Sequence, residues 1–210
     1  MAIEHRRSPG LTGRRDWRRS SDEGVESNTR LTVSLGAVLL VLLVAEGVTV
    51  PQARSLLSAH VFIGMLLVPP VLLKMSSTGW RFVRYYRGAP AYRRKGPPPA
   101  LLRILGPAVV LATVVLLGSG IALVTLPQSW RQPMKTVHLA SFILWFGVMA
   151  IHVLGHVVET ARVAPLDWAR RTRHDVAGAG ARQWSVAASL VVGVALGLVM
   201  LGPASHYRHF

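Results

Sequence analysis

The stretch from residue 134 to residue 158 reads MKTVHLASFILWFGVMAIHVLGHVV, and it is long and apolar enough to cross a lipid bilayer as one helix. Four more apolar stretches of similar length lie at about 31–50, 55–75, 101–126 and 183–202. Because 51% of the residues are hydrophobic and they gather in long blocks, the composition excludes an ordinary soluble domain. The sequence therefore predicts an all-α integral membrane protein, a bundle of five transmembrane helices in contact with lipid.

Basic residues alternate with these spans along the chain. The sequence has 24 Lys and Arg against 9 Asp and Glu, and most of the basic residues fall within 1–30, 76–100 and 159–182. Positively charged loops remain on the cytoplasmic side, so the N-terminus is expected in the cytoplasm and the C-terminus outside it. The charge is explained by topology, and we expect no nucleic-acid partner.

Three regions follow from this pattern. Residues 1–30 are polar and lack apolar periodicity, which predicts a disordered basic cytoplasmic tail that lies against anionic lipid. Residues 31–202 form the transmembrane bundle, and 203–210 form a short extracytoplasmic tail. The abundance of Arg, Ala, Val and Gly suggests a GC-rich bacterial genome, and with it the bacterial cytoplasmic membrane.

Two histidines lie at matching depths in two of the predicted spans. His60 follows the start of the second span, and His138 follows the start of the fourth, so helical rise places them roughly 8 Å and 6 Å inside the outer face. In neighbouring spans these imidazoles would face each other and hold the iron of a haem b from both sides. The chain has no cysteine, so any haem is held noncovalently. An alternative is that each histidine is hydrogen-bonded across helices.

Glycines and cations accompany this pair. Gly64 lies one turn from His60 and would leave room for a flat macrocycle, and Gly118 and Gly120 of the third span fall at the same depth. A haem has two propionates that need cations. The basic residues expected near that level are Arg54, Arg131 and Lys135.

A second group of polar residues lies deeper in the spans. His152 is fourteen residues after His138, but the residue fourteen after His60 is Lys74. One haem is therefore expected, and a second haem through His152 is an alternative. His152 and His156, spaced i,i+4, are also candidates for a proton relay, a quinone head-group site or simple hydrogen bonds. Glu46 would accept a proton from quinol, orient a ligating imidazole, or pair with Arg54.

The sequence over roughly 55–160 resembles bacterial b-type membrane cytochromes, which include the cytochrome b subunits of respiratory oxidoreductases and the ferric-reductase-like transmembrane proteins. The likeness rests on His60 with Gly64, and on His138, His152 and His156 in HLASFILWFGVMAIHVLGH. It implies a four-helix haem-binding core, with His60 and His138 as axial ligands of an outer haem. Lys74 departs from the pattern at the second ligand of an inner haem.

The resemblance also implies a function. Such subunits pass electrons between the quinone pool and a partner oxidoreductase subunit, so we expect an electron-transfer subunit rather than an enzyme acting alone. The chain has no flavin or nicotinamide fingerprint. The alternative from another class is a cofactor-free membrane scaffold or a small proton-coupled transporter.

Overall fold

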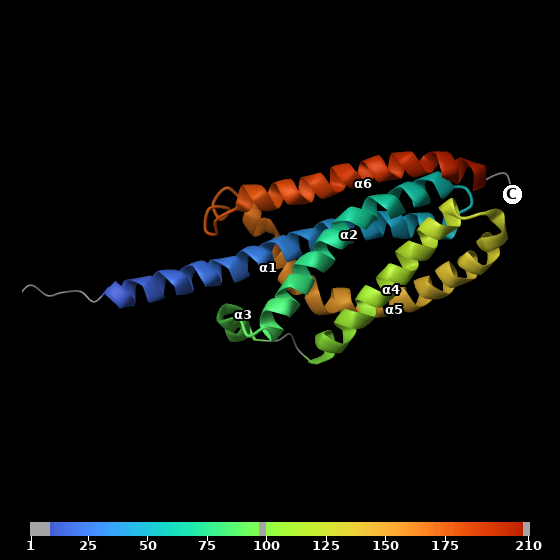
Figure 1. Cartoon of the computed structure of the whole chain (residues 1–210). Coiled ribbons are helices and arrows are strands. Elements are labelled where there is room, and N and C mark those ends of the chain that lie inside the picture. Colours follow the sequence, from blue (N-terminus) through green and yellow to red (C-terminus); the bar gives the residue numbers. More distant parts are fainter. Residues whose placement is uncertain (1–8, 97–99, 208–210) are drawn as a thin grey trace, which may run out of the picture.

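The computed structural model is a bundle of long helices (Figure 1). It describes residues 9–96 and 100–207, with side chains described over 22–96, at 100 and over 103–205. Five stretches within the described residues are helical, long and apolar enough to cross a membrane, which confirms the prediction of five spans. The long helices are α1 (Pro9–Thr49), α2 (Leu57–Tyr86), α4 (Ala100–Thr125), α5 (Arg131–Val163) and α6 (Ala179–Tyr207). The short helices are α3 (Pro90–Lys95), η1 (Val50–Gln52), η2 (Gln128–Trp130) and η3 (Ala164–Asp167).

The long helices pack as two units. Helix α2 packs against α6 and α1, whereas α4 and α5 form an antiparallel hairpin (Figure 1). Helices α2 and α5 make few close backbone approaches to each other, and the boundary between the units, here called the seam, is crossed mainly by α1 with α5, α2 with α4 and α4 with α6. The buried core lies within the first unit, where Val61 and Met65 of α2 meet Ala204 of α6.

Two glycines explain why α6 lies so close to α2. A Cβ atom at Gly193 would be 2.6 Å from the backbone oxygen of Leu66, and one at Gly197 would be 2.6 Å from Cδ2 of Phe62. Glycines spaced by four residues lie on one face of a helix and allow another backbone to approach closely. The G-x-x-x-G spacing in 193–197 therefore sets the distance between these helices.

A buried charge cluster stabilises one end of the bundle, here called the basic end, which includes residues 87–96 and 164–178. Asp167 is 2% exposed, and its carboxylate accepts hydrogen bonds from Arg182 of α6 and Arg30 of α1. Arg30 also donates to the backbone oxygen of Thr172, and Arg182 to the hydroxyl of Ser27. These bonds join α1, η3, the following loop and α6.

The same region differs from the expectation that 1–30 is disordered. Helix α1 begins at Pro9, so helix covers most of that segment, while residues 1–8 lie outside the described residues. Polar contacts stabilise the added turns: the amide of Asn28 donates to the Ser77 hydroxyl over 3.0 Å, and Arg30 bonds Asp167. At the other terminus α6 continues to Tyr207, into the segment expected to be a short tail.

Candidate functional site

The structure brings His60 and His138 together across the seam. Their ring centroids are 6.4 Å apart and the ring planes are nearly perpendicular, at 86°. His60 comes from α2 in the first unit and His138 from α5 in the second. The two connections at this end, 50–56 and 126–130, are short, and the fourth residue of α2 meets the eighth residue of α5, so α5 begins about one helical turn farther out than α2.

The Nδ1 atom of His60 is held by two oxygen atoms from α1. It lies 3.1 Å from Oε1 of Glu46 and 2.9 Å from the hydroxyl of Thr49. Thr49 Oγ1 in turn donates toward the Glu46 backbone oxygen over 2.6 Å and lies 3.2 Å from Glu46 Oε2. An ionised Glu46 carboxylate accepts a hydrogen bond from Nδ1, and this tautomer leaves the lone pair of Nε2 for another partner.

The Nδ1 atom of His138 is held in the same way by α4. It lies 3.1 Å from the backbone oxygen of Leu116 and 3.1 Å from the hydroxyl of Ser119. A backbone carbonyl is also only an acceptor, so here too Nδ1 is the donor and Nε2 keeps its lone pair. Gly120 makes this position possible, because a Cβ there would be 3.1 Å from Cε1 of His138.

This pairing fits a metal held between two imidazoles. A metal ion bonds an imidazole nitrogen at about 2 Å and that nitrogen lies about 1.2 Å from the ring centre, so two opposed rings sharing one ion have centres roughly 6.4 Å apart. The observed centroid separation is 6.4 Å. Hydrogen bonding of the second ring nitrogen to an oxygen is the usual support for a metal-binding histidine. Among the described residues, no cluster of three or more His, Cys, Asp or Glu side chains suited to a metal ion was found.

The glycines predicted at this level have different surroundings. A Cβ at Gly64 would lie 3.5 Å from Glu46 Oε1, an ordinary van der Waals distance. Gly118 has no atom within 4 Å of its ideal Cβ, so Gly120 alone of the GSG pair adjoins the His138 ring.

The predicted cations lie at the same end of the bundle as the histidine pair. Arg54 is exposed in the connection before α2, Arg131 begins α5 with a half-buried side chain, and Lys135 is exposed one turn later. The structure places Glu46 on His60 and Thr49, and no ion pair found among the described residues joins Glu46 to Arg54.

The deeper polar residues form a second group between α1, α2 and α5. Lys74 donates to the backbone oxygen of Thr32 over 2.7 Å, and a Cβ at Gly36 would be 3.0 Å from its Nζ. The rings of His152 and His156 have centroids 4.7 Å apart, and Nδ1 of His152 is buried without a hydrogen-bond partner. Lys74 thus donates to α1, and Thr160 of α5 also lies within 4 Å of the ideal Cβ of Gly36, so Lys74 lies where α1 and α5 approach each other.

His156 continues this group toward the basic end. Its Nδ1 lies 3.5 Å from Oε2 of Glu159, and both side chains are partly exposed. The arrangement keeps the titratable residues of α5 on one side of the helix, as the i,i+3 and i,i+4 spacings predict.

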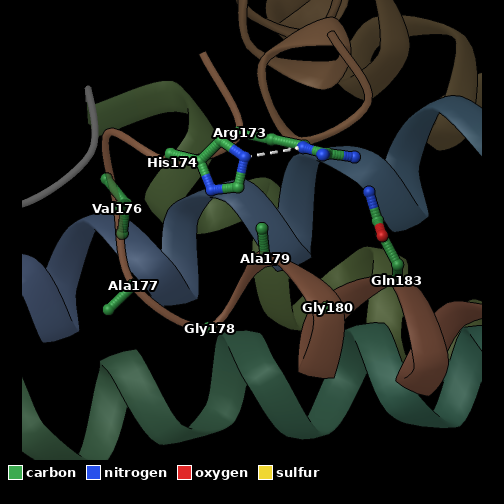
Figure 2. A pocket seen from close by; sticks show the side chains of 8 residues that line it. All are labelled: Arg173, His174, Val176, Ala177, Gly178, Ala179, Gly180 and Gln183. Atoms are coloured by element: carbon green, nitrogen blue, oxygen red, sulfur yellow. Dashed lines mark hydrogen bonds between the residues drawn. The ribbon is translucent and has the colours of Figure 1, made fainter. Parts of the chain in front are cut away.

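A separate hollow lies in the loop before α6, at the basic end (Figure 2). It has a volume of about 370 Å³ and is lined mainly by small residues of 176–180. Arg173 Nε donates to Nε2 of His174 over 2.9 Å at its rim, so these two polar groups bond each other. The hollow is far along the chain from the histidine pair and shares no residue with it.

Several residues of the site were not expected from the sequence. Thr49 and Ser119 are short polar residues near helix ends or in a GSG motif, types that commonly bond their own backbone. Their contact with the histidines depends on the rotation of α1 and α4 about their axes, which hydropathy does not determine. The backbone oxygen of Leu116 carries no sequence signal at all.

Comparison with known proteins gave no match, whether to family models, to curated protein sequences or to solved structures.

Proposed function

We propose that this chain is a membrane electron-transfer protein, similar in role to a cytochrome b subunit, that holds one haem b between His60 and His138. The observation that carries the proposal is the shared arrangement of the two imidazoles. Both have Nδ1 bonded to oxygen and Nε2 left for a metal, at a centroid separation of 6.4 Å. When bound, a haem b supplies an iron that takes up and releases one electron.

The protein's own residues would hold the cofactor and limit its chemistry. His60 and His138 would hold the haem from both sides and would leave no position open for oxygen or another substrate, which would favour electron transfer. The cofactor would lie at the seam between α2 and α5, which make few close backbone approaches to each other. Arg54, Arg131 and Lys135 at the same end are candidate partners for its propionates.

The five spans and the basic loops also bear on the location of the protein and on its partners. Five spanning helices make the protein a multi-pass membrane protein. We place it in a bacterial cytoplasmic membrane with the basic end in the cytoplasm, by the positive-inside rule. Electrons would then pass between quinone in the bilayer and a partner oxidoreductase at the opposite face. Because the sequence has no cysteine, single cysteines at Ala177 and Gln128 would test this orientation by labelling from one side only.

The decisive experiment is a reduced-minus-oxidised absorption spectrum of the purified protein, with haem quantified per chain. We expect one low-spin haem b, and its loss in both His60→Ala and His138→Ala. His174→Ala changes an exposed histidine at the basic end and serves as the matched control. Size-exclusion profiles in detergent would show that each variant is folded. A full haem complement in both ligand variants would contradict the assignment.

A colourless protein after expression with adequate haem would also contradict it, and would favour the second candidate function. In that case the chain is a scaffold or a small proton-coupled transporter. The observation behind this alternative is the deeper group of Lys74, His152, His156 and Glu159, which lies within the spans and contains a buried nitrogen without a partner. Proton flux that depends on His156 would support it.

A further inference from the structure

The two imidazoles of the site differ in what their Nδ1 atoms bond. His138 faces neutral oxygens, those of the Leu116 backbone and the Ser119 hydroxyl. His60 faces a carboxylate, Oε1 of Glu46, at 3.1 Å. The site therefore has one neutral side and one side with an acidic residue.

The acidic side is built into the packing of α1 on α2. Glu46 has 15% of its side chain exposed and Thr49 is 4% exposed, so both are largely removed from solvent. Thr49 holds the carboxylate from within α1, with its Oγ1 3.2 Å from Oε2 of Glu46, and it contacts Nδ1 of His60 as well. The carboxylate is thus fixed in place against the ring.

From this asymmetry we propose that Glu46 is a positioning residue that lowers the reduction potential of the iron held by His60. The inference rests on the proposed function. A hydrogen bond to an ionised acceptor is roughly twice as strong as one between neutral groups, so it draws the Nδ1 proton further from the ring. The ring then donates more electron density through Nε2, which stabilises the oxidised metal.

The negative charge of Glu46 also lowers the reduction potential. Glu46 is the acidic residue in contact with the histidine pair, and its negative charge disfavours the added electron. Burial reduces the screening of that charge by water. On the other side, Ser119 and the Leu116 carbonyl orient His138 without adding a net charge.

The test is the midpoint potential of the purified haem protein, measured by spectroelectrochemical titration at one pH. Glu46→Gln keeps the shape of the side chain and replaces the anionic acceptor by a neutral one. We expect the variant to retain haem and to favour the reduced state about tenfold more, which is about 59 mV for one electron. Ser119→Ala removes a neutral partner of the other histidine and is expected to shift the potential by less.

The outcomes separate the two proposals. Absence of haem from the unmodified chain would overturn the proposed function. Equal potentials in the unmodified chain and in Glu46→Gln, both with haem bound, would overturn the role of Glu46 alone. If Glu46→Gln loses haem, the second variant is Glu46→Asp, which keeps the negative charge. Haem binding at the potential of the unmodified chain would support the role of the charge. Loss of haem in Glu46→Asp as well would contradict that role.

Discussion

Substituting Gly193 by alanine tests the close packing of α6 on α2. The new Cβ would lie 2.6 Å from the backbone oxygen of Leu66 and 3.1 Å from its Cα, whereas ordinary carbon contacts are about 3.5–4.0 Å. The neighbours are backbone atoms and cannot rotate away, so the helices must separate by roughly 1 Å. Overpacking of this kind costs about 1–3 kcal/mol.

Alanine also favours a helix over glycine by about 1 kcal/mol, which would mask part of that cost. Gly147→Ala is the matched control, because Gly147 lies in the middle of α5 with nothing within 4 Å of its ideal Cβ. The difference between the two variants isolates the steric cost. We expect the Gly193 variant to melt several degrees lower in detergent, at about 2–4 °C per kcal/mol. Equal melting temperatures for the two variants would refute the close approach of α6 to α2.

Two further substitutions test the site and the basic end. Gly120→Ala should reduce haem content severalfold, because its Cβ would lie 3.1 Å from Cε1 of His138. Gly118→Ala should keep the haem, because no atom lies within 4 Å of the ideal Cβ at Gly118. A pyridine haemochrome assay of both variants measures the haem content. Asp167→Asn should lower the free energy of unfolding by about 3–5 kcal/mol, because it leaves two buried guanidinium groups without their counter-charge. Asp22→Asn, which breaks an exposed ion pair, should cost less than about 1 kcal/mol, and similar unfolding curves for these two variants would contradict the cluster's role.

The five spans could be predicted because lipid imposes one simple requirement. Every backbone polar group in the hydrocarbon must bond within its own segment, so long apolar stretches become helices whatever their partners. The meeting of His60 and His138 could also be foreseen, since short connections fix the level at which α2 and α5 begin. Both predictions depend only on the length of the apolar stretches and on the position of a residue along its helix axis.

What the sequence did not reveal depends on rotation about the axis and on contacts between distant segments. The pairing of α2 with α6 follows from Gly193 and Gly197, which read as ordinary small residues until their neighbours are known. Helix α1 includes Arg30, whose charge is compensated by Asp167 more than a hundred residues later in the chain. Polar partners at such separations leave no local pattern.

The pairing of α2 with α6 determines which surface of α2 stays uncovered while the chain is being synthesised. The two helices that pack most closely are separated in the chain by the whole α4–α5 hairpin (Figure 1). During synthesis the face of α2 that carries Phe62 and Leu66 therefore stays exposed to lipid or to the insertion machinery until α6 emerges from the ribosome. A chain that stops before Ala179 would contain every residue of the histidine pair and its supports, yet would lack the helix that covers this face of α2.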